Sequence, residues 1–107
     1  MQRVAFVIRV RPEKLEEYKK LHNPIWPDLA AELKAAGIRN YSLWLQPDGT
    51  EFGYLECTDW TAACAYLDKS AVHTRWQELM KDFLLTPTDS SQGGQPVVML
   101  EQSFLLE

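Results

Sequence analysis

The 107-residue chain has few of the residues on which several common kinds of site depend. It contains only two cysteines and two histidines, and no glycine-rich loop stands between an expected strand and an expected helix. His22 and His73 do not form a two-histidine helical metal motif, and a phosphate-binding loop would lack its glycines. The sequence therefore predicts a site with neither a bound metal nor a phosphate cradle.

Long apolar runs and clusters of basic charge are also missing. The 11 Lys and Arg residues are outnumbered by 15 Asp and Glu, and the formal net charge is −4. A mildly acidic chain without a basic cluster is not typical of nucleic-acid binding. No apolar run approaches the length of a membrane span, and the first residues enter a strand pattern without a charged and then apolar leader. We expect neither a nucleic-acid nor a membrane partner.

The two cysteines, Cys57 and Cys64, stand in apolar surroundings without ligand spacing. A disulfide between them is possible, but a domain of this size does not need one. Nothing in the sequence brings either thiol beside His22 as a nucleophile pair. We expect buried, reduced thiols, a cytoplasmic location and one domain spanning residues 1–107.

Alternating apolar residues predict four strands, at 3–11, 39–46, 52–58 and 97–106. In the first, Val4, Phe6, Ile8 and Val10 share a face, and in the second Tyr41, Leu43 and Leu45 do. A Pro-Asp-Gly turn at 47–49 joins the second strand to the third as a hairpin.

Helical spacing predicts a helix that starts at Pro12 and ends past His22, a second at 28–36, a third at 60–68 and a fourth from Ser70 to Phe83. Thr58 or Asp59 can cap the third helix. A polar loop rich in Pro, Gly and Ser follows at 86–96.

The order of the elements indicates a split βαβ arrangement. Strand, helix, strand, strand, helix, strand gives an α+β, ferredoxin-like βαββαβ fold, with a four-stranded antiparallel sheet and its helices on one face. The other face, which carries Trp44 or its strand neighbours, would be a large exposed apolar patch. Pairing two sheets across a two-fold axis covers it, so we expect a homodimer.

The candidate site lies on the first helix. Leu15, Tyr18, His22, Ile25 and Leu29 fall in one apolar stripe. A phenol and an imidazole one turn apart on this inward face need polar partners or a ligand there. Because the residue before a proline is driven from the helical region, the Asn-Pro step after His22 ends the helix and leaves an opening beside the imidazole.

A lone histidine on an apolar stripe is more often a core residue than a catalyst. Three features favour a site for a small polar ring such as a sugar. They are Tyr18 on the same face as His22, the helix break, and Tyr41 on a strand that the helix should cover. Trp76 can supply an apolar wall, although core packing explains its spacing equally well. We expect His73 on a helix flank in water, and a chemistry of proton transfer without metal or covalent intermediate.

The chain resembles the L-rhamnose mutarotase family over most of its length. The resemblance is carried by AFV in the first strand, EEY ending at Tyr18, HNPIWP at 22–27, NY at 40–41 and RW at 75–76. It implies a dimeric α/β barrel whose last strand is exchanged with or docked on the partner. It also implies interconversion of the α and β anomers of L-rhamnose without a cofactor.

The resemblance assigns the proton donor to His22 and the sugar-binding positions to Tyr18, Tyr41, Trp76 and Gln77. The family pattern has a second tryptophan where this chain has Gln77, which makes the sugar wall smaller or more polar. The Gly-Gly pair at 93–94 is a second departure. Two other hypotheses for the function of this fold stay open: a cofactor-free monooxygenase-like enzyme and a non-catalytic small-molecule binding module.

Overall fold

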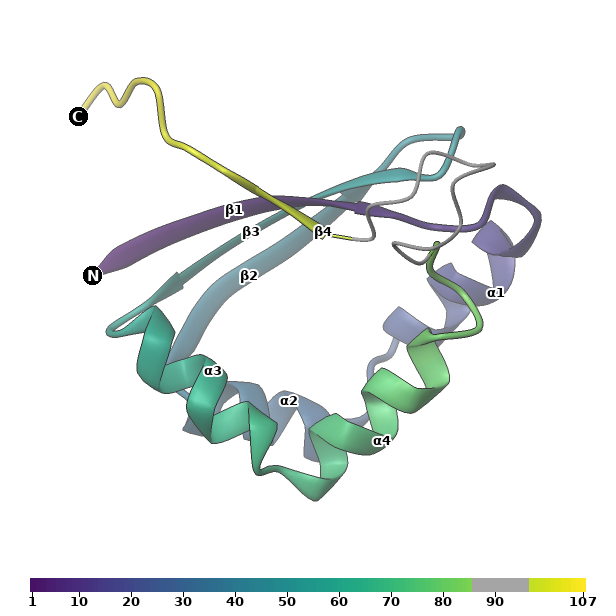
Figure 1. The fold of residues 1–107 in the computed structure, drawn as a ribbon, viewed down its shortest axis with the longest axis horizontal. Helices are drawn as coiled ribbons and strands as arrows, with labels where there is room; N and C mark the ends of the chain where they lie inside the picture. Colours follow the sequence, from purple (N-terminus) through teal and green to yellow (C-terminus); the bar gives the residue numbers. More distant parts are fainter. Residues whose placement is uncertain (86–96) are drawn as a thin grey trace.

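The computed structural model describes residues 1–85 and 97–107 (Figure 1). Its elements, in chain order, are β1 (Gln2–Arg9), a 3-10 turn η1 (Pro12–Lys14), α1 (Leu15–His22), α2 (Pro27–Ala35), β2 (Ile38–Leu45), β3 (Thr50–Cys57), α3 (Trp60–Asp68), α4 (Ala71–Met80) and β4 (Val97–Leu100). Among these residues, no helix is both long and apolar enough to cross a membrane.

The four strands form one antiparallel sheet in the order β2-β3-β1-β4. Both connections that contain helices return over the same face, so that α1 to α4 form a layer below the sheet in Figure 1. This arrangement confirms the predicted ferredoxin-like α+β fold, with two helices in each connection as predicted.

The core fills the space between this layer and the inward face of the sheet. Val4 and Phe6 of β1 point inward, opposite Leu55 and Gly53 of β3. They pack with Ile38, Ala63 and Leu67. The predicted inward face of the first strand is therefore confirmed, and burial of these side chains is the main favourable contribution to folding.

A bulge in β2 decides which of its residues face the helices. Between Arg39 and Ser42, three steps along β2 match two steps along β3, and Asn40 has a positive φ of 51°. The extra residue changes the alternation, so that Ile38 before the bulge and Leu43 after it both lie on the helix side. The bulge thereby brings Tyr41 to the inner face, as expected.

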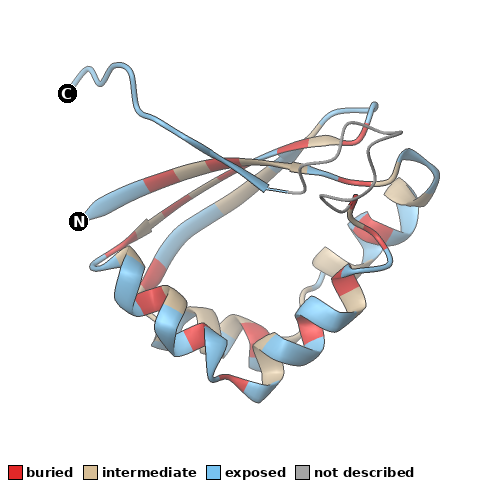
Figure 2. Cartoon of the chain, in the orientation of Figure 1, coloured by how far each residue is buried: buried red, intermediate tan, exposed pale blue. Residues whose placement is uncertain are grey.

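The outer face of the sheet is apolar and open. Trp44 of β2 pairs with Phe52 of β3, Phe52 with Val7 of β1, and Val7 with Val98 of β4. Trp44 is 68% exposed, and Phe52 and Val98 are also exposed. Figure 2 shows the buried residues concentrated where the helices and the sheet meet, and the C-terminal residues exposed throughout.

Several predicted boundaries are wrong: β1 ends at Arg9 rather than at 11, α1 begins at Leu15 rather than at Pro12, and α4 ends at Met80 rather than at Phe83. The last strand ends at Leu100 rather than at 106, and residues 101–107 run on past the sheet in irregular conformation, because strand pairing to β1 stops at Leu100 (Figure 1). The third strand begins at Thr50, two residues earlier than predicted. The predicted loop at 86–96 lies outside the described residues.

Candidate functional site

Helix α1 and the break after it build the first wall of the site. The predicted stripe is inward, with Tyr18 and Leu29 buried and His22 half-buried. The helix ends at His22, and Asn23 has φ −142° and ψ 87°, outside the helical region, as the following proline requires. Pro27 then opens α2 at a position where its missing N–H is harmless.

The ring of His22 is held in a defined orientation. Its Nδ1 lies 2.9 Å from the carbonyl oxygen of Tyr18, one turn earlier. A carbonyl can only accept, so Nδ1 carries a hydrogen and donates it. Nε2 is then the nitrogen with which this ring can exchange a proton with a ligand.

Aromatic rings surround the imidazole. The ring centroids of Tyr18 and His22 are 4.4 Å apart, and those of His22 and Trp76 are 5.1 Å apart in an edge-to-face arrangement. Trp26, beside the helix break, packs edge-to-face on Trp76 with centroids 5.0 Å apart. These contacts fix both the imidazole and the tryptophan that faces it.

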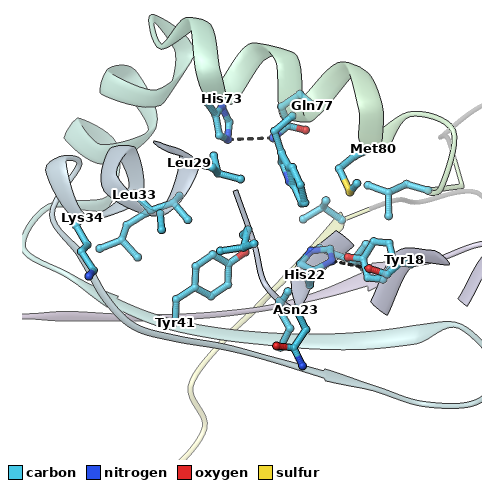
Figure 3. A pocket seen from close by; sticks show the side chains of 18 of the residues that line it. Tyr18, His22, Asn23, Leu29, Leu33, Lys34, Tyr41, His73, Gln77 and Met80 are labelled. Carbon is cyan, nitrogen blue, oxygen red and sulfur yellow. Dashed lines mark hydrogen bonds between the residues drawn. The ribbon is translucent and has the colours of Figure 1, made fainter. Parts of the chain in front are cut away.

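A cavity of about 650 Å³ opens between α1, α2, α4 and the inner face of the sheet (Figure 3). This volume is ample for a monosaccharide and within the range of small-molecule sites. In Figure 3, Tyr41 rises from the sheet toward the helix layer, with His22 and Tyr18 from α1 beside it.

All five residues predicted for the site line this one cavity: Tyr18, His22, Tyr41, Trp76 and Gln77. They come from α1, β2 and α4. These three elements are far apart in the sequence, and the fold brings them together. Their individual roles remain predictions.

His73 does not lie on a solvent-facing flank, and that prediction is wrong. It is half-buried, lines the cavity, and its Nε2 lies 3.2 Å from the amide nitrogen of Gln77, one turn further along α4. Burial lowers the pKa of His73. The apolar stripe of this helix is centred on Trp76, and the sequence pattern places His73 beside it. The cavity wall extends past the stripe to the flank of α4 that carries His73 and Gln77.

Sequence reasoning missed Glu51, a buried carboxylate next to the site. Its Oε1 accepts a hydrogen bond of 2.6 Å from the hydroxyl of Tyr18. Because the predicted turn covers 47–49 and the predicted third strand begins at 52, residue 51 belongs to neither prediction. Alternate residues of a strand share a face. A strand extended back by two residues would therefore have placed Glu51 on the same face as Gly53, Leu55 and Cys57.

Burial and this carboxylate control the electrostatics of the site. Desolvation, followed by the nearby charge and hydrogen bond of Glu51, raises the pKa of Tyr18 far above its usual range. Desolvation and the charge of Glu51 raise the pKa of Tyr41 to about 12. Desolvation also raises the pKa of Glu51, although the Tyr18 hydrogen bond and His22 oppose it. Both phenols are therefore neutral at pH 7 and can donate or accept hydrogen bonds.

The arrangement suits proton transfer to and from a polar ring. In the described ranges 1–85 and 97–107, no three His, Cys, Asp or Glu side chains gather as a metal site. Cys57 and Cys64 are free thiols, as expected, although Cys64 is only half-buried. An imidazole, two phenols and a tryptophan face can bind a sugar by hydrogen bonds and by stacking against its C–H groups.

Comparison with known sequences agrees with this geometry. A family model described as L-rhamnose mutarotase matches residues 3–106. The chain is 38% identical to an L-rhamnose mutarotase of Acidiphilium cryptum, over 91% of this chain and 93% of that protein. It is 36% identical to one of Burkholderia orbicola over the full length of both.

Solved structures have the same fold. A crystal structure of an L-rhamnose mutarotase from Formosa agariphila matches with a TM-score of 0.80, at 24% identity and over 100% of both chains. An antibiotic biosynthesis monooxygenase matches with a TM-score of 0.62, at 18% identity, over 95% of this chain and 98% of that one. At these identities the structures support the ferredoxin-like fold alone.

Proposed function

Because the chain belongs to the L-rhamnose mutarotase family, we propose that it interconverts the α and β anomers of L-rhamnose without a cofactor. The protein is accordingly a carbohydrate isomerase of the racemase and epimerase class. Residues 1–107 act as one mutarotase domain.

The observation that carries the proposal is the position of His22. Its imidazole stands in the wall of a cavity of about 650 Å³, with Nδ1 hydrogen-bonded to the Tyr18 carbonyl, the tilted Tyr18 ring on one side and Trp76 in an edge-to-face contact. A ring held in this way is oriented before the ligand arrives, which is the main requirement of general acid catalysis.

Mutarotation opens the pyranose and closes it on the other face of the aldehyde. In our proposal protonated His22 gives its proton to the ring oxygen as the bond between the anomeric carbon and that oxygen breaks. Tyr18 and Tyr41 hold the hydroxyl groups of the sugar, and Trp76 stacks on its C–H face. A positioned general acid contributes about 10²–10⁴-fold, enough to matter for a reaction that already proceeds in water.

Gln77 makes this sugar wall more polar than a tryptophan would. Together with His73, one turn earlier on α4, it presents hydrogen-bonding groups beside Trp76. We place a sugar hydroxyl at this pair, which leaves related 6-deoxy and pentose sugars as competing substrates.

We further propose a homodimer in which the outer faces of two sheets pack together. The exposed apolar side chains of Trp44, Phe52 and Val98 support this arrangement. Residues 101–107 would then dock on the partner, since Phe104 is 77% exposed in the single chain. The two free thiols are consistent with a cytoplasmic protein.

The test is a panel of monosaccharides at anomeric equilibrium, with anomer exchange followed by NMR saturation transfer. We expect catalytic amounts of protein to accelerate exchange for L-rhamnose more than for other sugars. L-Rhamnose should also raise the thermal unfolding temperature. Absence of both effects for every sugar would contradict the proposal and favour a monooxygenase-like enzyme or a binding module.

A further inference from the structure

Glu51 lies behind the cavity wall formed by Tyr18. It is 3% exposed and, in the described part of the chain, the only buried residue that is acidic or basic. It lies on the inner face of β3, opposite Ile8 of β1 and Leu45 of β2. Its hydrogen bond of 2.6 Å to the Tyr18 hydroxyl connects it to the cavity.

Stability does not explain a carboxylate at this position. Burying a charged group costs free energy, which one hydrogen bond recovers only in part. Its neighbours on the inner face, Ile8 and Leu45, are aliphatic, so a leucine would fill the position without that cost.

We propose that Glu51 is a positioning residue that acts through Tyr18. By accepting the phenol hydrogen, it turns the Tyr18 oxygen toward the cavity as an acceptor for the anomeric hydroxyl of the sugar. This inference rests on the proposed mutarotase function, and it supplies the base for that reaction.

The proton transfers balance. During ring opening the anomeric hydroxyl gives its proton to the Tyr18 oxygen, while Tyr18 gives its own proton to Glu51. At the same time the ring oxygen takes a proton from protonated His22, and the bond from the anomeric carbon to the ring oxygen breaks. The products are the neutral open-chain aldehyde, neutral His22 and protonated Glu51. Ring closure on the opposite face reverses each transfer and restores the site.

The groups that face Glu51 make this relay specific. The titratable groups near it are Tyr18 and His22 from α1 and Tyr41 from β2. Its strand partners, Ile8 and Leu45, carry no charge. Other helices contribute Trp76, Met80 and His73 from α4 and Lys34 from α2 to the lining of the cavity. Glu51 is therefore the only carboxylate, within residues 1–85 and 97–107, with a hydrogen bond to a cavity-lining phenol.

The experiment compares Glu51→Gln with the parent by anomer exchange across pH. The amide keeps the size and the acceptor oxygen for Tyr18 but cannot take the proton. We expect the rate for L-rhamnose at neutral pH to fall at least about tenfold. The parent rate should decline as pH is lowered through the Glu51 ionisation, and this acid limb should vanish in Glu51→Gln.

Tyr18→Phe removes the bridging oxygen and should give the same loss of rate and of the acid limb. The double variant should be no slower than either single variant, since both interrupt one relay. The matched control is Tyr54→Phe, because Tyr54 donates a similar hydrogen bond of 2.7 Å to Glu56 on the opposite face of the same sheet. It should retain the parent rate and pH profile.

The outcomes separate this inference from the proposed function. A parent chain that accelerates exchange, with Glu51→Gln matching it in rate and acid limb, would overturn the role of Glu51 and leave the function intact. A parent chain without acceleration for any sugar would overturn both. If Glu51→Gln does not fold, an unchanged pH profile in Tyr18→Phe would be equally decisive against the relay.

Discussion

Tyr18 and His22 show how one helical turn can orient the imidazole that we propose as the proton donor. The i to i+4 spacing brings the centroids of the two tilted rings to 4.4 Å, and the backbone carbonyl of Tyr18 fixes the tautomer of His22. The spacing and the Asn-Pro step are legible in the sequence, so this pair could be predicted. The side of α4 that lines the cavity could not, because it depends on how α4 packs across the sheet.

Glu51 gives a prediction for stability at the scale of one residue. Its pKa in the folded protein lies above its usual range, so the native state keeps this proton to higher pH than the unfolded chain does. The unfolded chain then binds fewer protons between the two pKa values, and stability falls as pH rises through that interval. The unfolding free energy of the parent, relative to that of Glu51→Gln, should decline across it and then level off.

Urea unfolding of both proteins at a series of pH values measures this difference. A parent that gains stability relative to Glu51→Gln as pH rises would show that the carboxylate is stabilised by its surroundings. That result would remove the argument that Glu51 is retained for function.

At the scale of elements, the prolines, glycines and capping residues predict most of the places where helices begin and end. Pro24 and Pro27 divide α1 from α2, and Asp59 and Ser70 accept hydrogen bonds from the first turns of α3 and α4. The bulge in β2 left no comparable signal. Asn40 tolerates a positive φ, but only pairing with β3 shows that an extra residue is needed to turn Ile38 and Leu43 to one face.

Gly53 is required by the close approach of β3 to the core. A Cβ at this position would overlap the ring of Phe6, which is buried on β1 directly opposite. Gly53→Ala should therefore lower the unfolding free energy by about 1–3 kcal/mol, as overpacking of a core does.

The partner variant Gly53→Ala with Phe6→Leu tests the cause. Because leucine leaves room beside the new methyl group, the double variant should lose less stability than the sum of the single losses. Additive losses, measured by urea unfolding, would show that the Phe6 ring is not the obstacle.

At the scale of the whole molecule, the sheet has one covered and one open face. The helix layer and the cavity account for the inner face, and the outer face presents Trp44, Phe52 and Val98 to solvent. Strand alternation predicted both faces from the sequence. It could not predict that pairing of the last strand stops at Leu100, because the apolar pattern continues to Leu106.

Trp44→Glu should dissociate the proposed homodimer, because it places a charge within the apolar contact between the two sheets. Size-exclusion chromatography with light scattering should give a dimer for the parent and a monomer for the variant. Ala65→Glu, an exposed substitution on α3, adds the same charge on the helix side and should remain dimeric. A monomeric parent would contradict the sheet-to-sheet assembly.

The central claim is that His22 is the proton donor of an anomer-interconverting enzyme. Its most direct test is the rate of L-rhamnose anomer exchange, measured by NMR saturation transfer for the parent, for His22→Gln and for Glu17→Gln, an exposed control on α1. We predict that His22→Gln loses about 10²–10⁴-fold of the acceleration while staying folded, and that Glu17→Gln keeps it. A folded His22→Gln protein that exchanges the anomers at the parent rate would contradict the account.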